Sequence, residues 1–199
     1  MITKDKLVEL ENKYGGVVTT GKGRRSPLDP HKKARTHMGG DRMGHNGYAE
    51  AYAKHLPENP KTLVELGVLK GTGLAIWCDL YPNARIIGLD LNLDEFYDEG
   101  YLLKFGAFAK NRPETYRFDK FEDNSEFYKQ VAPIDVWIDD SAHGAEGIMY
   151  AFNNVKPFLS DDFVCFIEDN NYVAEKLRDV HPEFTYHRYR NNRITVITK

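Results

Sequence analysis

From residue 61 onward the chain alternates between short apolar runs and helical patterns, and this alternation restricts the fold more than any other feature. The apolar runs fall at residues 61–68, 84–92, 114–121, 134–140 and 162–170, and helical patterns follow at 72–82, 94–110, 124–131, 145–159 and 172–182. Continuous apolar runs indicate strands that are buried on both faces. That is typical of a parallel sheet covered by helices on both sides.

The end of the chain has a different pattern. Two alternating segments, residues 184–190 and 193–199, are separated by Asn191-Asn192, which predicts an antiparallel hairpin. Together with the preceding strand–helix units, the pattern predicts an α/β, Rossmann-like fold. We expect a seven-stranded, mostly parallel sheet that closes with the C-terminal antiparallel hairpin and carries helices on both faces.

The first 60 residues precede this core. Residues 3–14 and 46–56 have helical spacing, and the segment between them is rich in Gly, Pro and basic residues. We interpret residues 1–60 as an N-terminal helix, a basic flexible arm and a substrate-side helix, and residues 61–199 as the core of a single domain overall. The arm is either a solvated, mobile segment or a lid over an anionic or hydroxylated ligand. Its basic residues are Lys22, Arg24, Arg25, Lys32, Lys33 and Arg35.

Charge and apolar content exclude several classes of protein. The 199 residues carry a net charge of −3, and the sequence pI is about 6.2, so there is no electrostatic basis for a nucleic-acid or membrane partner. No apolar run approaches the roughly 18–20 residues of a membrane-spanning helix. Cys78 and Cys165 stand among apolar residues and are expected to be buried free thiols. We therefore expect a cytoplasmic protein, and leave a homo-oligomer open.

Polar residues at the ends of the first three strands predict a cofactor site. In open α/β sheets, ligands bind beyond the carboxyl ends of the strands. Glu65, Gly67 and Gly71 end the first strand and begin the following turn, Asp90 ends the second strand, and Asp119 follows the third. Glycines allow a tight turn and a close approach to a helix N-terminus, and an acidic side chain can accept hydrogen bonds from ribose. The spacing misses the dinucleotide fingerprint GxGxxG, and the glycines alone could serve only a tight turn.

The next two strands end in carboxylates. Asp139 and Asp140 follow one strand, and Glu168 and Asp169 follow its expected neighbour. Four carboxylates brought together repel one another unless a cation compensates them, and oxygen-rich clusters suit hard cations such as Mg²⁺. The alternative is that they are ordinary strand-end residues that cap helix N-termini. His143, three residues after Asp140, adds a group that can accept a proton near neutral pH.

The loop "VELGVLKGTG" with Asp90 resembles class I S-adenosylmethionine-dependent methyltransferases. The resemblance implies that Glu65, Gly67 and Gly71 hold the amino-acid part of the cofactor, that Asp90 holds its ribose, and that Asp119 meets its adenine. Leu69 replaces the second glycine of the family's E-x-G-x-G-x-G loop.

From about residue 39 to 170 the chain is similar, in more detail, to the macrolide-sugar O-methyltransferases of the macrocin and mycinamicin type. The similarity is carried by "GGDRMGHNGYAEAYAKHL", "DDSAH" and "NNVKPFLSDDFVCFIEDN". It implies that Asp140, Glu168 and Asp169 bind Mg²⁺ and that His143 is the general base. In a second register, that of the catechol-type enzymes, Asn170 rather than Glu168 would be a ligand. Asp139 is expected to support the cofactor side of the site.

The same resemblance points to a reaction. It implies transfer of a methyl group to a hydroxyl of a small molecule, of the sugar or natural-product type, with S-adenosylmethionine and Mg²⁺ as cofactors. His45 and Tyr48 lie in the matched upstream segment and are candidates for the substrate pocket, or else for helix capping and packing. Two alternatives remain: a related activity of the hydroxylase type, and a catalytically silent module that binds S-adenosylmethionine or a nucleotide.

Overall fold

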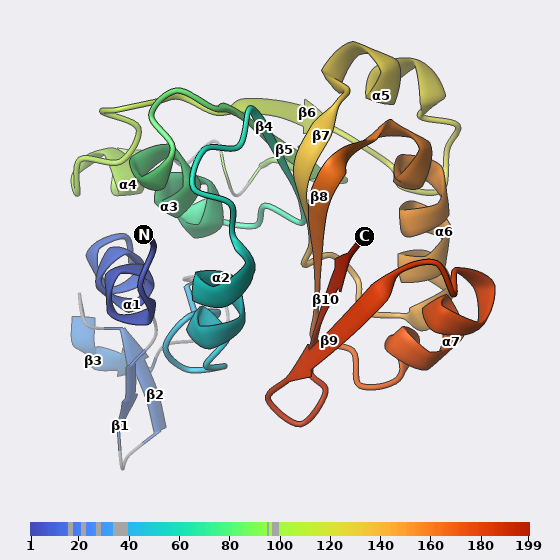
Figure 1. Cartoon of the computed structure of the whole chain (residues 1–199). Coiled ribbons are helices and arrows are strands. Elements are labelled where there is room, and N and C mark those ends of the chain that lie inside the picture. Colours follow the sequence, from blue (N-terminus) through green and yellow to red (C-terminus); the bar gives the residue numbers. More distant parts are fainter. Residues whose placement is uncertain (16–17, 21–22, 27–28, 34–39, 95, 97–99) are drawn as a thin grey trace.

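The main sheet has seven strands. The computed structural model describes residues 1–15, 18–20, 23–26, 29–33, 40–94, 96 and 100–199. The strands of the main sheet are β4 (Thr62–Leu66), β5 (Arg85–Asp90), β6 (Glu114–Arg117), β7 (Ile134–Asp139), β8 (Leu159–Glu168), β9 (Thr185–Tyr189) and β10 (Ile194–Thr198). They lie in the order β6-β5-β4-β7-β8-β10-β9 (Figure 1). Six of these seven strands run in one direction, and β10 runs opposite to them. The predicted fold class, including the terminal hairpin, is confirmed.

Helices cover both faces of this sheet. On one face lie α1 (Lys4–Lys13), α2 (Ala49–His55) and α3 (Thr72–Leu80), and on the other α5 (Ser125–Val131), α6 (Ala145–Val155), the 3₁₀ turn η2 (Lys156–Phe158) and α7 (Val173–Val180) (Figure 1). Successive strand residues face opposite sides, so Leu63 packs toward α3 while Val64 packs toward α6. The central strands β4, β5 and β7 are mostly apolar because both of their faces are buried.

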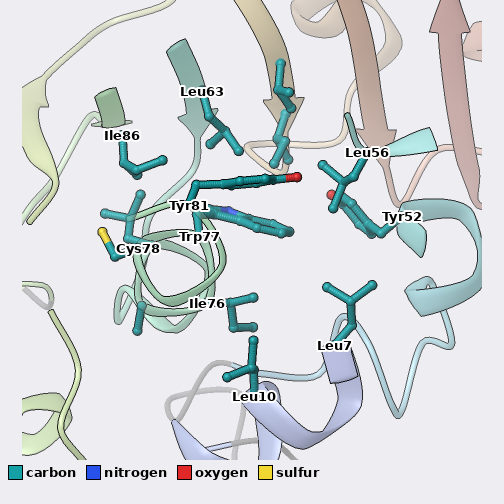
Figure 2. Packing of buried hydrophobic residues seen from close by; sticks show 14 of the residues in the cluster. Leu7, Leu10, Tyr52, Leu56, Leu63, Ile76, Trp77, Cys78, Tyr81 and Ile86 are labelled. Atoms are coloured by element: carbon teal, nitrogen blue, oxygen red, sulfur yellow. The ribbon is translucent and has the colours of Figure 1, made fainter. Parts of the chain in front are cut away.

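The core on the α3 side includes the N-terminal helix. Leu7 and Leu10 of α1 point toward Ile76 of α3, and Tyr52 of α2 lies beside Trp77 with the ring centroids 5.3 Å apart (Figure 2). All five side chains are almost completely buried. The N-terminal segment is thus packed onto the sheet by the same apolar burial that stabilises the core.

One predicted helix is much shorter than expected. Within residues 94–110 the structure has only α4 (Gly100–Leu103), and residues 95 and 97–99 lie outside the described part. Gly106 and Phe108 have φ angles of 72° and 62°. Left-handed residues interrupt the hydrogen-bond pattern of a right-handed helix, so the segment continues as turns.

Between α1 and α2 the backbone forms a small antiparallel sheet of β1 (Val18–Thr20), β2 (Gly23–Ser26) and β3 (Asp29–Lys33), below α1 in Figure 1. Lys22 and Arg35 of the predicted arm lie outside the described residues, as do the side chains of its other basic residues. Its role as a lid stays a prediction. Cys78 and Cys165 are buried free thiols, as predicted. No helix among the described residues is long and apolar enough to cross a membrane.

Candidate functional site

The carboxyl ends of β4, β5, β7 and β8 open into one cavity of about 580 Å³. Most of the residues expected to bind the cofactor, the metal or the transferred proton line this cavity. They are Glu65, Gly67, Asp90, Asp119, Asp140, His143 and Asp169. Of the other predicted site residues, all within the described part of the chain, Gly71, Asp139, Glu168, His45 and Tyr48 are not part of its lining.

Glycines bring the loop after β4 against its neighbours. Gly67 has a φ of 98°, and a Cβ atom there would lie 2.4 Å from the backbone oxygen of Asp140. Gly71 has a φ of 83° and stands at the N-cap of α3. Gly73 is helical, and a Cβ there would lie 2.3 Å from Oε1 of Glu65. The first and third glycines therefore permit close approach, and the second permits a left-handed turn.

Asp90 organises the same loop. Its Oδ2 accepts hydrogen bonds from the backbone nitrogens of Val68 (2.7 Å) and Leu69 (3.2 Å), and its Oδ1 accepts one from that of Asn92 (3.0 Å). Both lone pairs of Oδ2 are thus used by the loop, whereas Oδ1 has one further lone pair available to a ligand. Leu69, which stands where the E-x-G-x-G-x-G pattern has its second glycine, has a φ of 48°.

Apolar side chains flank the acidic residues on this side of the cavity. Leu91 and Phe121 line it and are exposed, and Phe118 lies between them and the core. Asp119 accepts a hydrogen bond from the backbone nitrogen of Phe121 (2.9 Å). Flat apolar surface beside hydrogen-bonding carboxylates fits a nucleoside.

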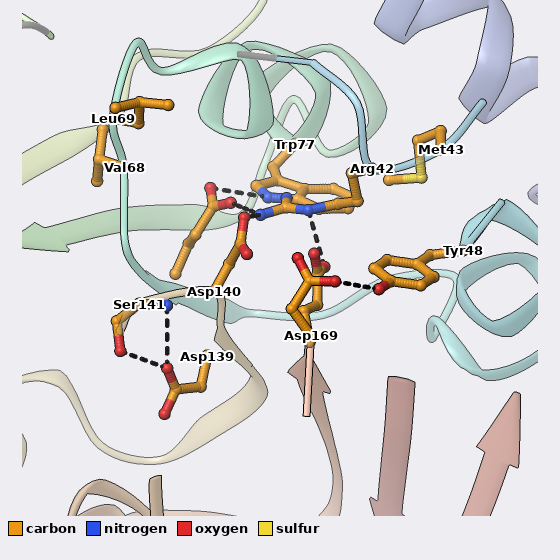
Figure 3. Close-up of polar contacts among 12 residues, drawn as sticks. Arg42, Met43, Tyr48, Val68, Leu69, Trp77, Asp139, Asp140, Ser141 and Asp169 are labelled. Atoms are coloured by element: carbon orange, nitrogen blue, oxygen red, sulfur yellow. Dashed lines mark hydrogen bonds and ion pairs between the residues drawn. The ribbon is translucent and has the colours of Figure 1, made fainter. Parts of the chain in front are cut away.

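Across the cavity, a buried arginine stands among the strand-end carboxylates (Figure 3). Nη2 of Arg42 lies 2.5 Å from Glu65 and 2.8 Å from Asp140, and its Nε lies 2.8 Å from Glu168. The guanidinium carbon is 5.7 Å from the ring centre of Trp77. The contact with Asp140 has hydrogen-bond geometry, whereas Nε meets Glu168 at close range without that alignment. The sequence predicts a cation beside Asp140 and Glu168, but it does not identify Arg42.

A signal for this residue was present in the sequence. Arg42 is the sole lysine or arginine between residues 40 and 48, in the segment that resembled the macrolide-sugar enzymes. Its backbone is fixed from α1, because the buried carboxylate of Glu11 accepts hydrogen bonds from the backbone nitrogens of Met43 and Gly44, both at 2.7 Å. Burial raises the pKa of Glu11 to about 7.

Burial and Arg42 act in opposite directions on the cluster. Burial raises the pKa of Glu65, Asp140 and Glu168, and the guanidinium of Arg42 opposes that rise in each case. Burial likewise disfavours the charged form of Arg42, but Glu168 and Glu65 hold its pKa above its ordinary value. The charges of the cluster are therefore interdependent.

Asp140, His143 and Asp169 form a second, more open group. Each of the three offers one ligand atom, and these atoms all lie within 4.8 Å of one another. Two carboxylates and an imidazole are a donor set that a divalent cation can use. Glu168 differs: it is 1% exposed, and Tyr52 donates a short hydrogen bond to the Oε1 that faces Arg42.

Asp169 has an unusual backbone. Its φ is 54°, in the left-handed region that non-glycine residues seldom adopt. Its Oδ1 accepts a 2.5 Å hydrogen bond from the hydroxyl of Tyr48, which is buried, and also pairs with Arg193. The sheet register explains the second contact, because Ile194 of β10 lies opposite Glu168 of β8. Burial raises the pKa of Tyr48, so it is a hydrogen-bond donor here.

The loop between β7 and α6 is held by side chains behind it. Oδ1 of Asp139 accepts hydrogen bonds from the nitrogen (3.1 Å) and hydroxyl (2.6 Å) of Ser141, and Nζ of Lys120 donates to that hydroxyl (2.8 Å) and to the oxygen of Ala142 (3.1 Å). Asp139 thus supports the loop that presents Asp140 and His143. The two adjacent aspartates, Asp139 and Asp140, therefore have separate contacts (Figure 3).

Asn170 and His45 complete the set of predicted residues. The amide of Asn170 donates to the backbone oxygen of His143 (2.8 Å) and accepts from the backbone nitrogens of Tyr172 (3.0 Å) and Val173 (2.7 Å). It therefore joins the start of α7 to the His143 loop. His45 is half-buried.

The strand order, the glycine-rich turn and the acid at the end of β5 together define the fold of class I methyltransferases. No protein-family model matches the sequence, and neither does any curated protein. Solved methyltransferases share the fold across most of the chain. Their sequence identities lie below 20%, so the likeness concerns the fold alone.

One similar structure is that of MycE, a methyltransferase of the mycinamycin biosynthetic pathway, in complex with Mg, SAH and mycinamycin VI. The two sequences are 17% identical, and the TM-score is 0.64. The match covers 98% of this chain and 53% of MycE, so the chain spans about half the length of that protein. A precorrin-6y C5,15-methyltransferase from Geobacter metallireducens is 14% identical, with 75% of this chain and 85% of that chain covered and a TM-score of 0.55. A putative caffeoyl-CoA O-methyltransferase from Staphylococcus aureus is 12% identical, with coverages of 70% and 75% and a TM-score of 0.52.

Proposed function

We propose that the chain is an S-adenosylmethionine-dependent O-methyltransferase that acts, with a divalent cation such as Mg²⁺, on a hydroxyl of a small molecule. One observation carries the proposal: a single cavity brings together Asp90 and Asp119 on one side and Asp140, His143 and Asp169 on the other. A methyl donor and a hydroxyl acceptor must meet in such a space. The presence of Mg, SAH and mycinamycin VI in the MycE structure supports the choice of reaction.

On the cofactor side, the residues fit a nucleoside with an amino-acid tail. Asp90 would accept hydrogen bonds from the ribose hydroxyls, and Asp119 would lie near the adenine between Leu91 and Phe121. Gly67 and Gly71 shape the loop around the tail, and Glu65 provides a carboxylate beside it.

On the acceptor side, Asp140 and Asp169 would hold the cation, and the resemblance adds Glu168 as a third ligand. S-adenosylmethionine supplies the methyl group when bound, and the cation lowers the pKa of the acceptor hydroxyl. His143 lines the cavity close to both aspartates and would accept the hydroxyl proton. Tyr48 orients Asp169, and His45 is a candidate for contact with the acceptor from the segment before α2.

The proposal is tested in two stages. Calorimetry should show binding of S-adenosylhomocysteine, and preference for NAD would overturn the cofactor assignment. Methyl transfer from labelled S-adenosylmethionine to a panel of sugar alcohols, glycosides and phenols should then fall about 10²-fold or more with EDTA and with His143→Ala. Activity that survives both changes would remove the metal-and-base mechanism.

A catalytically silent binding module is the alternative. It predicts that S-adenosylhomocysteine binds but that no acceptor in the panel is methylated. Glu146→Ala is a matched control for His143→Ala, because Glu146 is an exposed residue of the same segment and does not line the described cavity. Its activity should equal that of the unmodified protein.

A further inference from the structure

Arg42 changes how the strand-end carboxylates can share a cation. Glu65, Asp140, Glu168 and Asp169 carry four negative charges when ionised, and Arg42 and Arg193 return two positive ones. The remaining charge of −2 is what one divalent cation would neutralise. Part of the compensating positive charge, for which the sequence indicated a metal ion, is therefore supplied by a guanidinium.

Exposure divides the carboxylates into two pairs, although Arg42 also contacts Asp140 of the more exposed pair. Glu65 and Glu168 are 1% exposed, and their contacts are with Arg42 and with the aromatic donors Trp77 and Tyr52, respectively. The side chains of Asp140 and Asp169 are 29% and 21% exposed and line the cavity. Glu168 is thus turned into the protein, and Glu65 reaches the cavity wall with almost no exposed surface, whereas the second pair faces the space where a ligand can enter.

Arg42 is held firmly in this position. Glu11 fixes Met43 and Gly44, the two residues that follow Arg42, by accepting hydrogen bonds from their backbone nitrogens. Its guanidinium lies over Trp77, and the close passage of α3 at Gly73 leaves no room beside Glu65 and Arg42, because a Cβ there would lie 2.8 Å from Nη1. Removal of the arginine from Glu168 would leave a buried carboxylate without its partner, which is strongly unfavourable.

We propose that Arg42 is a positioning residue that acts as the resident cation of the cluster: it keeps Glu65 and Glu168 out of the metal site. Asp140 and Asp169 are then the carboxylates that a divalent cation meets, with His143 beside them. This refines the metal site of the proposed function and rests on it. It also departs from the ligand set that the family resemblance implies, because Glu168 is assigned to the arginine.

The first experiment measures Mn²⁺ affinity by electron paramagnetic resonance for the unmodified protein, Asp169→Asn and Glu168→Gln. We expect Asp169→Asn to weaken Mn²⁺ binding about tenfold or more, and Glu168→Gln to change it by less than about threefold. A loss in Glu168→Gln as large as that in Asp169→Asn would overturn the assignment of Glu168 to Arg42.

The second experiment uses no metal. In EDTA, Arg42→Met should lower the urea midpoint of unfolding, and Arg42→Met combined with Glu168→Gln should recover part of that loss, because the double variant leaves no unpaired charge at Glu168. If Arg42→Met does not fold, Arg42→Gln replaces it in the same pair. A double variant no more stable than the single one would contradict the proposal.

The two experiments separate two kinds of failure. If Mn²⁺ does not bind the unmodified protein, the metal-dependent part of the proposed function fails. The pairing of Arg42 with Glu168 is then decided by the EDTA measurement alone. If Mn²⁺ binds and Glu168→Gln does not restore the arginine variant, the proposed function stands and the resident-cation proposal falls.

Discussion

Along the loop after β4 the cavity is formed by backbone, whereas beyond β7 and β8 it is formed by side chains from separate parts of the chain. Gly67 and the amides of Val68 and Leu69 build the first side with the carboxylate of Asp90, and all of them lie within one strand–helix–strand stretch, β4-α3-β5. Arg42 reaches the second side from the segment before α2. The first side depends on steric freedom of the backbone, and the second depends on compensation of charge.

Among the substitutions that test this difference, we expect the largest loss of stability at Gly67. Gly67→Ala should destabilise the protein by about 3 kcal/mol in urea unfolding, because Ala is strained at a φ of 98° and its Cβ would contact the backbone of Asp140. Gly106→Ala is the matched control: its φ is 72°, but nothing lies within 4 Å of its Cβ, so we expect about 1 kcal/mol. If the two variants lost the same stability, backbone strain alone would explain why residue 67 is a glycine, and the close approach of the two loops would not contribute.

The same difference explains what the sequence could reveal. The succession of strands and helices, the hairpin and the residues at the strand ends follow from local apolar and polar patterns, which the chain carries from residue 61 to 199. Asp90 and Gly67 could be found because they stand at the ends of such patterns. Arg42 could not be assigned, because its contact with Glu168 spans 126 positions and depends on how α1 holds the intervening segment.

Local pattern also failed where backbone conformation interrupts it. Residues 94–110 have helical composition, yet left-handed turns at Gly106 and Phe108 leave α4 as the only helix in the described part of that range. Similarly, the alternating pattern that predicts the terminal hairpin does not show which residue Arg193 contacts. The register of β10 against β8 instead places Arg193 at Asp169. Tertiary register decides such contacts, and a single sequence does not display it.

The charged side of the cavity should show its sensitivity through pH. The pKa of Glu11 is about 7 in the folded protein, against an ordinary value of 4.5, because burial disfavours its charge. The folded state therefore binds the proton more tightly, so this contribution to stability is complete below pH 4.5 and is lost as the pH rises through 7. The loss amounts to up to about 3 kcal/mol.

Urea unfolding of Glu11→Gln from pH 5 to 8 measures this contribution. The variant should lack that part of the decline, so the unmodified protein should lose stability relative to it as the pH rises. Glu9→Gln, at an exposed position of the same helix, is the control and should follow the unmodified protein. Parallel curves for Glu11→Gln and the unmodified protein would exclude Glu11 as the residue through which α1 makes the Arg42 segment sensitive to pH.

On the cofactor side, the expected effect is one of binding. Asp90→Ala removes the carboxylate that accepts from Val68 and Leu69 and that would meet the ribose. We expect affinity for S-adenosylhomocysteine, measured by calorimetry, to fall about tenfold to a hundredfold, or about 1.4–2.7 kcal/mol. Asp94→Ala, an exposed position on the following turn, should leave affinity unchanged. An unchanged affinity in Asp90→Ala would remove Asp90 from the proposed cofactor site.

The smallest effect is expected at the second arginine of the cluster, and it tests whether burial is what distinguishes the two. The side chain of Arg193 is 46% exposed, against 8% for Arg42, although both pair with strand-end carboxylates. Exposed ion pairs contribute little because water solvates both partners, so Arg193→Ala should cost about 0.5 kcal/mol in urea unfolding. Removing Arg42 leaves buried carboxylates unpaired and should cost several times more. A cost at Arg193 as large as that at Arg42 would mean that burial is not what distinguishes the two arginines.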